Sequence, residues 1–268
     1  MNAPQPILIG LPYDASSSYR RGPAQAPAAI REALHCESSN HWSEAQRDLS
    51  QLVDGGDLVL PPSSEARALI EQGIQRVLDQ GGLPISLGGD HSVTYPILRA
   101  LGPRHPDLTI LHLDAHPDLY QDFEGDLYSH ACPFARIMEE GLAKRLVQVG
   151  IRTMSGHQEA QADRFGVEVI DMRAWAAGVR PLLRGPLYVS IDLDAFDPAF
   201  APGVSHVEPG GLTSREVLTL LQHLPGPLVG ADVVEFNPGQ DPIGITAPLC
   251  AKLVKELASR MLETLGVP

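Results

Sequence analysis

Strand-like and helix-like segments alternate along nearly all of this chain of 268 residues. Short apolar runs rich in β-branched residues predict strands at 6–11, 57–60, 83–88, 108–113, 145–150, 167–171, 187–192 and 228–234. Helical periodicity appears between most of them, at 26–35, 65–80, 93–102, 129–141, 156–166 and 214–224. Such alternation is typical of an α/β fold, in which helices connect parallel strands. We expect one domain over residues 1–268, because α/β folds often reach about 250 residues as one unit.

A final helix is expected at roughly 245–265. Leu249, Leu253, Leu257 and Met261 follow one another at four-residue spacing there and would form an apolar stripe. We expect this stripe to cover the edge of the sheet or a neighbouring subunit.

The charge balance narrows the choice of partners. With 20 basic and 33 acidic residues the formal charge is −13, which disfavours nucleic acid and anionic membranes and is compatible with a cationic substrate. The apolar runs are of strand length, so no membrane span is expected. The N-terminal segment MNAPQPILIGLPYD lacks the basic region of a secretory signal, and a cytoplasmic protein is therefore expected. Cys36, Cys132 and Cys250 are widely spaced, which predicts free thiols.

Three short polar segments directly follow predicted strands. Their side chains are all of types that bind metals: His91 in GGDHS, Asp114, His116 and Asp118 in LDAHPD, and Asp192 and Asp194 in SIDLD. Residues at i, i+2 and i+4 of an extended chain share one face, so these side chains can converge. In an open α/β sheet, ligands bind at the carboxyl ends of the strands. The sequence therefore predicts a site at that edge.

Simpler roles exist for the weakest of these segments, since the glycines of GGDHS could form a turn and Asp90 could cap a helix. The other two are harder to explain without a ligand, because buried carboxylates are costly unless they bind a cation. Four carboxylates and two imidazoles without a thiolate favour Mn²⁺ over a structural Zn²⁺. Two ions that share aspartates could hold one water and deprotonate it, giving a hydroxide nucleophile.

Two further residues are candidates for catalysis. His130 lies where a loop meets a predicted helix and suits proton transfer, although it could equally bond to backbone. Glu235 ends the last predicted strand, where its carboxylate could pair with a planar guanidinium or remain solvated. Asp232, on the same strand, is expected to support a ligand. Six other histidines are expected to be surface or core residues: His35, His41, His105, His157, His206 and His223.

The motifs GGDHS, DAHPD, SIDLDAFDPAFAPG, EPGGL and GADVVEFNP resemble those of ureohydrolases of the arginase and agmatinase superfamily. The likeness runs from about Ile7 to the last helix and is greatest to the branch containing plant-type arginases. It implies a three-layer α/β/α sandwich around an eight-stranded parallel sheet, in trimers or hexamers. It also implies two Mn²⁺ ions per subunit. The first would bind His91, Asp114, Asp118 and Asp192, and the second Asp114, His116, Asp192 and Asp194.

The same resemblance implies that Asp114 and Asp192 bridge the ions, that His130 is the proton shuttle and that Glu235 binds the guanidinium. The expected reaction is hydrolysis of a guanidino group to urea and an amine. Agmatine is the first candidate and arginine the second, because LYQDFEGDLYSHA lacks the residues with which animal-type arginases bind the amino-acid end. Glu124 and Glu159 are the acidic residues considered for an amine at that end.

Several alternatives stay open. Guanidinobutyrate, aminopropylagmatine and formiminoglutamate would fit the same mechanism. A deacetylase of related fold would use one ion and fewer ligands. A non-catalytic oligomeric scaffold would not need His130 and Glu235.

Overall fold

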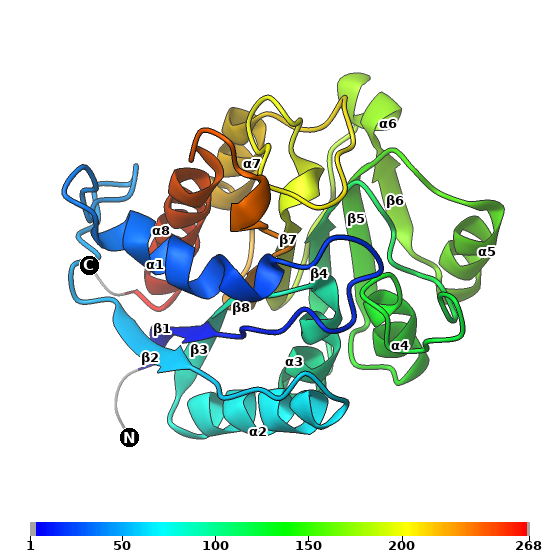
Figure 1. Ribbon diagram of the computed structural model, residues 1–268, viewed down its shortest axis with the longest axis horizontal. Helices are drawn as coiled ribbons and strands as arrows, with labels where there is room; N and C mark the ends of the chain where they lie inside the picture. Colours follow the sequence, from blue (N-terminus) through cyan, green and yellow to red (C-terminus); the bar gives the residue numbers. More distant parts are fainter. Residues whose placement is uncertain (1–3, 267–268) are drawn as a thin grey trace.

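A computed structural model describes residues 4–266. Its eight strands are β1 (Gln5–Gly10), β2 (Val53–Asp57), β3 (Gly82–Leu87), β4 (Thr109–Leu113), β5 (Arg145–Ile151), β6 (Glu168–Asp171), β7 (Leu187–Asp192) and β8 (Leu228–Val234). All neighbouring pairs are parallel, and the order across the sheet is β2-β1-β3-β8-β7-β4-β5-β6 (Figure 1). The last strand in the sequence thus lies between β3 and β7, at the centre of the sheet.

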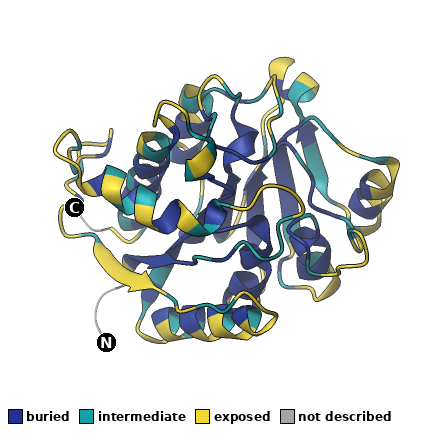
Figure 2. Ribbon diagram, in the orientation of Figure 1, coloured by how far each residue is buried: buried dark blue, intermediate teal, exposed yellow. Residues whose placement is uncertain are grey.

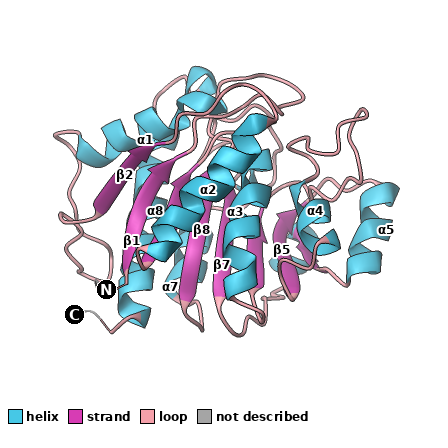
Figure 3. Ribbon diagram, turned by 90° about the horizontal axis from the view of Figure 1, so that it is seen from below, coloured by secondary structure: helices cyan, strands magenta, loops and turns pink. Residues whose placement is uncertain are grey.

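Helices cover both faces of the sheet (Figure 3). One layer consists of α1 (Ala26–His35), α6 (Met172–Ala176), α7 (Ser214–Gln222) and α8 (Thr246–Thr264), which share one apolar core with the sheet. The other consists of α2 (Glu65–Asp79), α3 (Thr94–Leu101), α4 (Pro133–Glu139) and α5 (Gly156–Phe165), which share a second core. Short 3₁₀ helices lie at η1 (Pro23–Gln25), η2 (His91–Val93), η3 (Gly102–Arg104), η4 (Leu193–Ala195) and η5 (Pro238–Gln240). The predicted three-layer α/β/α fold with an eight-stranded parallel sheet is confirmed.

The burial of each strand follows from the helices that cover the two faces of the sheet. Every residue of β4, β7 and β8 is buried, because helices cover both faces of these central strands (Figure 2). The edge strand β2 has the sequence VDGGD and is exposed throughout. Its two aspartates and two glycines suit an edge that must not pair with another chain.

Three details differ from the sequence-based expectations. The strand expected at 57–60 lies earlier in the sequence, at β2. The apolar residues at 58–60 follow this strand: Leu58 and Leu60 are partly buried against the core, while Val59 is 93% exposed. The last helix does not cover an edge: α8 packs over β1, β3 and β8, beside α1 and α7. The five-residue helix α6 was not predicted, being too short to show a helical period.

The carboxyl ends of β3, β8, β7 and β4 are neighbours and together form the floor of the site. Gly89 allows the chain after β3 to pass close to the loop after β1, since a Cβ atom there would lie 1.6 Å from the carbonyl oxygen of Tyr13. The Gly89 carbonyl oxygen also accepts the backbone N–H of Glu235 at 2.9 Å, so this segment lies beside the end of β8. Within residues 4–266, no helix combines the length and apolar composition that a membrane span needs.

Candidate metal and guanidinium site

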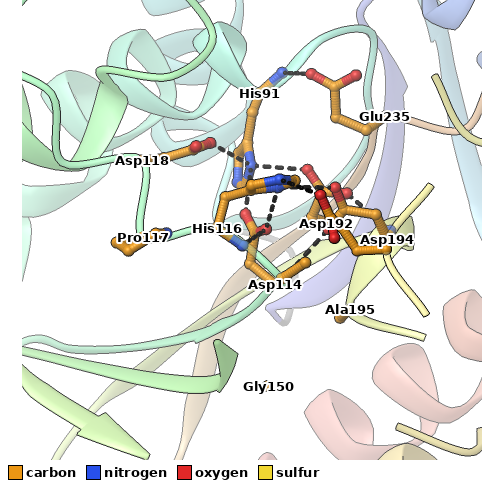
Figure 4. A network of polar contacts seen from close by, with 12 residues as sticks. His91, Asp114, His116, Pro117, Asp118, Gly150, Asp192, Asp194, Ala195 and Glu235 are labelled. Atoms are coloured by element: carbon orange, nitrogen blue, oxygen red, sulfur yellow. Dashed lines mark hydrogen bonds and ion pairs between the residues drawn. The ribbon is translucent and has the colours of Figure 1, made fainter. Parts of the chain in front are cut away.

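The three polar segments meet at the carboxyl edge of the sheet (Figure 4). His91 begins η2 after β3, and its Nδ1 lies 3.2 Å from Asp114 Oδ2, 3.1 Å from Asp118 Oδ2 and 3.1 Å from Asp192 Oδ2. The three carboxylates come from the loop after β4 and from the end of β7. Three carboxylate oxygens therefore lie within 3.2 Å of one imidazole nitrogen.

A second group lies beside the first. His116 Nδ1 is 3.0 Å from Asp194 Oδ2 and 3.5 Å from Asp114 Oδ1. The two oxygens of Asp114 thus face two different histidines, Oδ2 facing His91 and Oδ1 facing His116. Asp192 contacts His91 directly, while its Oδ1 accepts a hydrogen bond from the backbone N–H of Asp194 at 2.9 Å. All six predicted ligand residues are brought together.

The protonation of His91 follows from the residues behind it. Ser190 donates its hydroxyl proton to Asp232 at 2.6 Å, so its oxygen accepts from His91 Nε2, 2.9 Å away. His91 Nε2 therefore carries a proton, and Nδ1 is the nitrogen that faces the carboxylates and would bind a cation. Tyr188 and Thr94 also donate to Asp232. As expected, Asp232 supports a candidate ligand, through Ser190.

The electrostatics of the cluster favour a bound cation. Burial and the neighbouring aspartates raise the pKa of Asp192 well above its usual value and that of Asp194 to about 6. Among the described residues, no lysine or arginine forms an ion pair with Asp114, Asp118, Asp192 or Asp194, so their charge is balanced only by histidines. Buried carboxylates without cationic side chains are stable when they bind metal ions. Four carboxylates and two imidazoles suit Mn²⁺.

His130 and Glu235 lie next to this cluster and bond to each other. His130 Nδ1 donates to Glu235 Oε1 at 2.9 Å, and the same oxygen accepts the backbone N–H of His91 at 2.8 Å. Burial opposes the charge on His130, but Glu235 raises its pKa to about 9. On its other side, His130 Nε2 lies 2.7 Å from the hydroxyl of Ser18.

Two acidic residues of the site have unusual backbone conformations. Asp118 has φ 50° and Glu235 has φ 62°. Few residues other than glycine adopt this left-handed region, and those that do are concentrated at functional sites.

A cavity of about 370 Å³ opens above the cluster. His116, Asp118, Asp192, Asp194, His130 and Glu235 line its floor. Its outer wall includes Tyr120, Phe123, Thr153, Ser155, Gln158 and His206. Lysine and arginine side chains are absent from the described lining, so an anionic group of a ligand would meet no lysine or arginine there.

Glu124 and Glu159 are not among the residues that line this cavity. Glu159 instead lines a neighbouring cavity of about 430 Å³, and the two cavities share Met154. The idea that Glu124 or Glu159 meets the far end of a substrate gains no support from the lining.

Sequence reasoning missed several residues of the site. His112, two residues before Asp114 in β4, shares its face of the strand, and its Nε2 lies 2.7 Å from Asp114 Oδ2. The two-residue spacing in LHLDAH could have revealed it. No feature of the sequence indicated that Ser18 belongs to the site. His206, expected to be an ordinary surface or core residue, lines the cavity with its ring 5.3 Å from that of His130 and 5.9 Å from that of His116.

Known proteins resemble this chain in both fold and sequence. The model of the arginase family matches residues 5–259. The mitochondrial arginase 1 of Arabidopsis thaliana is 46% identical over 95% of this chain and 80% of its own length. An agmatinase of Bacillus anthracis is 35% identical over 94% of this chain and 90% of its own. The solved arginase from Medicago truncatula is 44% identical, with a TM-score of 0.92 over 97% of this chain and 88% of that one.

The chain therefore belongs to the arginase family of ureohydrolases. Its arginase and agmatinase relatives are hydrolases that act on C–N bonds of amidines, and the family depends on metals. The predicted family, fold class and enzyme class are confirmed.

The expected cytoplasmic location is contradicted. The plant relatives from Arabidopsis, rice and Medicago are named mitochondrial arginases, and a second Arabidopsis arginase is named chloroplastic and mitochondrial. These names point to organelles. The expectation depended on the N-terminal residues alone, and neither the fold nor the site carries information about the compartment.

Proposed function

We propose that this protein binds two Mn²⁺ ions and hydrolyses the guanidino group of a small substrate, releasing urea and an amine. The observation that carries the proposal is the position of Asp114, whose two carboxylate oxygens face two different histidines. A carboxylate in this position suits a bridge between two cations.

The donor set divides between two ions. His91, Asp118 and the Oδ2 atoms of Asp114 and Asp192 surround the first position. The second position is surrounded by His116, Asp194 and Asp114 Oδ1. Asp192 is linked to this second group because its Oδ1 accepts a hydrogen bond from the backbone N–H of Asp194. When bound, the two ions would supply a nucleophilic water of lowered pKa.

Glu235 and His130 would act on the substrate. The Glu235 carboxylate lines the cavity, where it would pair with the planar guanidinium and hold its carbon over the metal cluster. His130, fixed by Glu235 on Nδ1 and by Ser18 on Nε2, would move a proton to the departing amine nitrogen. Asp118 is both a candidate metal ligand and part of the cavity floor.

Arginine and agmatine are the two candidate substrates. Relatives at 44–46% identity are named arginases, which supports arginine, whereas those named agmatinases are 34–35% identical. The cavity lining supports agmatine, since arginine would bring a carboxylate to a wall without lysine or arginine. Neutral donors such as Thr153, Ser155 and Gln158 would have to bind that carboxylate.

Urea release measured in parallel on arginine, agmatine, guanidinobutyrate and formiminoglutamate tests the proposal. Glu235→Gln should abolish turnover of every guanidino substrate while Mn²⁺ remains bound. Glu124→Gln, an exposed carboxylate outside the cavity, is the matched control and should be fully active. A protein that releases urea from none of these compounds, or a Glu235→Gln variant with parental activity, would refute the proposed function.

We further propose a single domain and a homo-oligomer, a trimer or hexamer. One sheet with two continuous cores and a family match from residue 5 to 259 support the single domain. Light scattering on the purified protein measures the number of subunits.

A further inference from the structure

A buried histidine outside the predicted ligand set touches the metal cluster. His112 lies in β4, and its Nε2 is 2.7 Å from Asp114 Oδ2. Its other nitrogen, Nδ1, lies 3.0 Å from Nε2 of Gln148, which comes from the adjacent strand β5. The His112 ring stacks on Phe134, with ring centroids 3.9 Å apart and an angle of 28° between the planes. Neighbours therefore fix both its nitrogens and its plane.

The hydrogen bonds of Gln148 determine which nitrogen of His112 carries the proton. Gln148 Nε2 donates one hydrogen to the carbonyl oxygen of Pro117 at 2.6 Å, and that oxygen can only accept. The second hydrogen of the same amide nitrogen points to His112 Nδ1, which must therefore be unprotonated. In the neutral ring the proton is then on Nε2, and His112 donates it to Asp114.

The reverse orientation of the Gln148 amide does not fit. It would place Oε1 against the Pro117 carbonyl, so that two acceptors would face each other. In the orientation found, Gln148 Oε1 has no hydrogen-bond partner among the described residues. The bonds to His112 and Pro117 therefore decide the orientation of the amide.

From this geometry, and taking the metal role of Asp114 from the proposed function, we propose that His112 is a positioning residue. It donates a hydrogen bond to one oxygen of the bridging carboxylate, and Gln148 fixes its tautomer. Pro117 lies between His116 and Asp118, so the same Gln148 amide also holds the loop that carries two more candidate ligands.

The alternative is that His112 binds a metal itself. Ligand-type atoms of His91, His112 and Asp114 lie within 4.8 Å of one another, which is close enough for a shared ion. A histidine ligand needs a lone pair on the nitrogen that faces the metal. The lone pair of His112 is on Nδ1, which faces Gln148 and not the carboxylates, and this argues against the alternative.

The tautomer can be measured directly. Long-range ¹H–¹⁵N spectra of the metal-free protein with ¹⁵N-labelled histidine distinguish Nε2–H from Nδ1–H rings, and the signal that disappears in His112→Gln identifies His112. We expect the Nε2–H form. An Nδ1–H ring would overturn the proposal.

Mn²⁺ affinity gives an independent readout. Removing an outer partner of a metal ligand typically weakens metal binding by about 10–100-fold. We expect that loss in His112→Leu and in Gln148→Met, with near-parental affinity in His112→Gln, whose amide N–H can replace the donor. His105→Leu, at a half-buried histidine in the loop before β4, is the control. Because His112 is intact in Gln148→Met, that variant carries the test if His112→Leu does not fold.

Three outcomes of the Mn²⁺ measurements can be told apart. Parental Mn²⁺ affinity in both His112→Leu and Gln148→Met would overturn the positioning role. Loss of one whole ion in His112→Leu, without rescue by His112→Gln, would make His112 a ligand and would overturn it too. If the parent binds Mn²⁺ with the expected dependence on His112 but releases no urea, the proposed function fails and the positioning role stands.

Discussion

Glu235 holds His130 through the same oxygen, Oε1, with which it accepts the backbone N–H of His91. One carboxylate thus connects the candidate proton shuttle to the loop of a candidate metal ligand. His130 itself forms no hydrogen bond or ion pair with the aspartates that surround the metal positions, so its role can be separated from theirs by mutation.

Replacing His130 should slow the reaction without removing metal. In His130→Asn the shorter amide can still bond to Glu235, but it cannot transfer a proton. We expect kcat to fall by roughly 10²–10⁴, with two Mn²⁺ still present by elemental analysis. His223→Asn, at the exposed end of α7, should match the parent. Loss of metal from His130→Asn would show that His130 is a ligand.

Replacing either bridging candidate should remove metal and activity together. Asp114→Asn leaves one oxygen and one amide facing two metal positions, and Asp192→Asn weakens the contact to His91 and the bond that positions Asp194. Metal content and urea release should therefore fall in parallel in both variants. Asp163→Asn, on the exposed side of α5, is the control. A fully active Asp114→Asn enzyme is incompatible with a bridge.

Removing metal should destabilise the fold. Without cations, four buried aspartates repel one another, and ions that bind only the folded state stabilise it by about 2.7 kcal/mol at 100 times their Kd. The melting temperature should drop on treatment with EDTA and recover on addition of Mn²⁺. In Asp114→Asn the difference should be much smaller. An equal response in that variant would place the stabilising ions elsewhere.

The three cysteines should differ in reactivity. All are free: Cys36 is exposed, and Cys132 and Cys250 are buried. A hydrogen bond from the Ser38 hydroxyl lowers the pKa of Cys36, whereas burial raises the pKa of Cys132 to about 12 and also that of Cys250. Since the thiolate is the reactive form, only Cys36 should be alkylated rapidly near pH 8.

Iodoacetamide labelling followed by mass spectrometry measures this difference, and Cys36→Ser should label slowly. The rate for Cys36 should rise at lower pH than that of an ordinary thiol, because its folded pKa is depressed. Comparable labelling of Cys250 in the native protein would contradict its burial.

Much of the fold was predictable because burial imposes a regular pattern. The central strands are apolar on both faces, and the long helices show a 3.6-residue period, so their existence and approximate bounds could be inferred. The strand β2 escaped because an exposed edge needs no apolar residues, and its VDGGD looks like a turn. The position of α8 could not be inferred, since an apolar stripe does not say which strands it covers.

The candidate ligands were predictable for a similar reason. All except His91 follow strands at two-residue spacing, and such spacing is visible in one sequence. Ser18 is different, because it meets His130 across 112 positions of sequence through a loop held by Asp90. Contacts of this kind depend on how separate loops fold over each other. The tautomer of His112 likewise depends on the partner strand β5, which the residues near His112 do not specify.

The central place of β8 has a consequence for when the site can form during protein synthesis. His91 follows β3 and Asp192 ends β7, and β8 lies between these two strands. Neighbouring strands are about 4.8 Å apart, so β3 and β7 reach their final spacing only when β8 has been inserted. A nascent chain that has not yet emerged from the ribosome beyond Val234 therefore lacks the geometry of the first proposed metal position, which includes His91. The proposed binuclear centre can therefore be completed only after nearly the entire polypeptide has been made, and we expect no truncated form that ends before Leu228 to hold both ions.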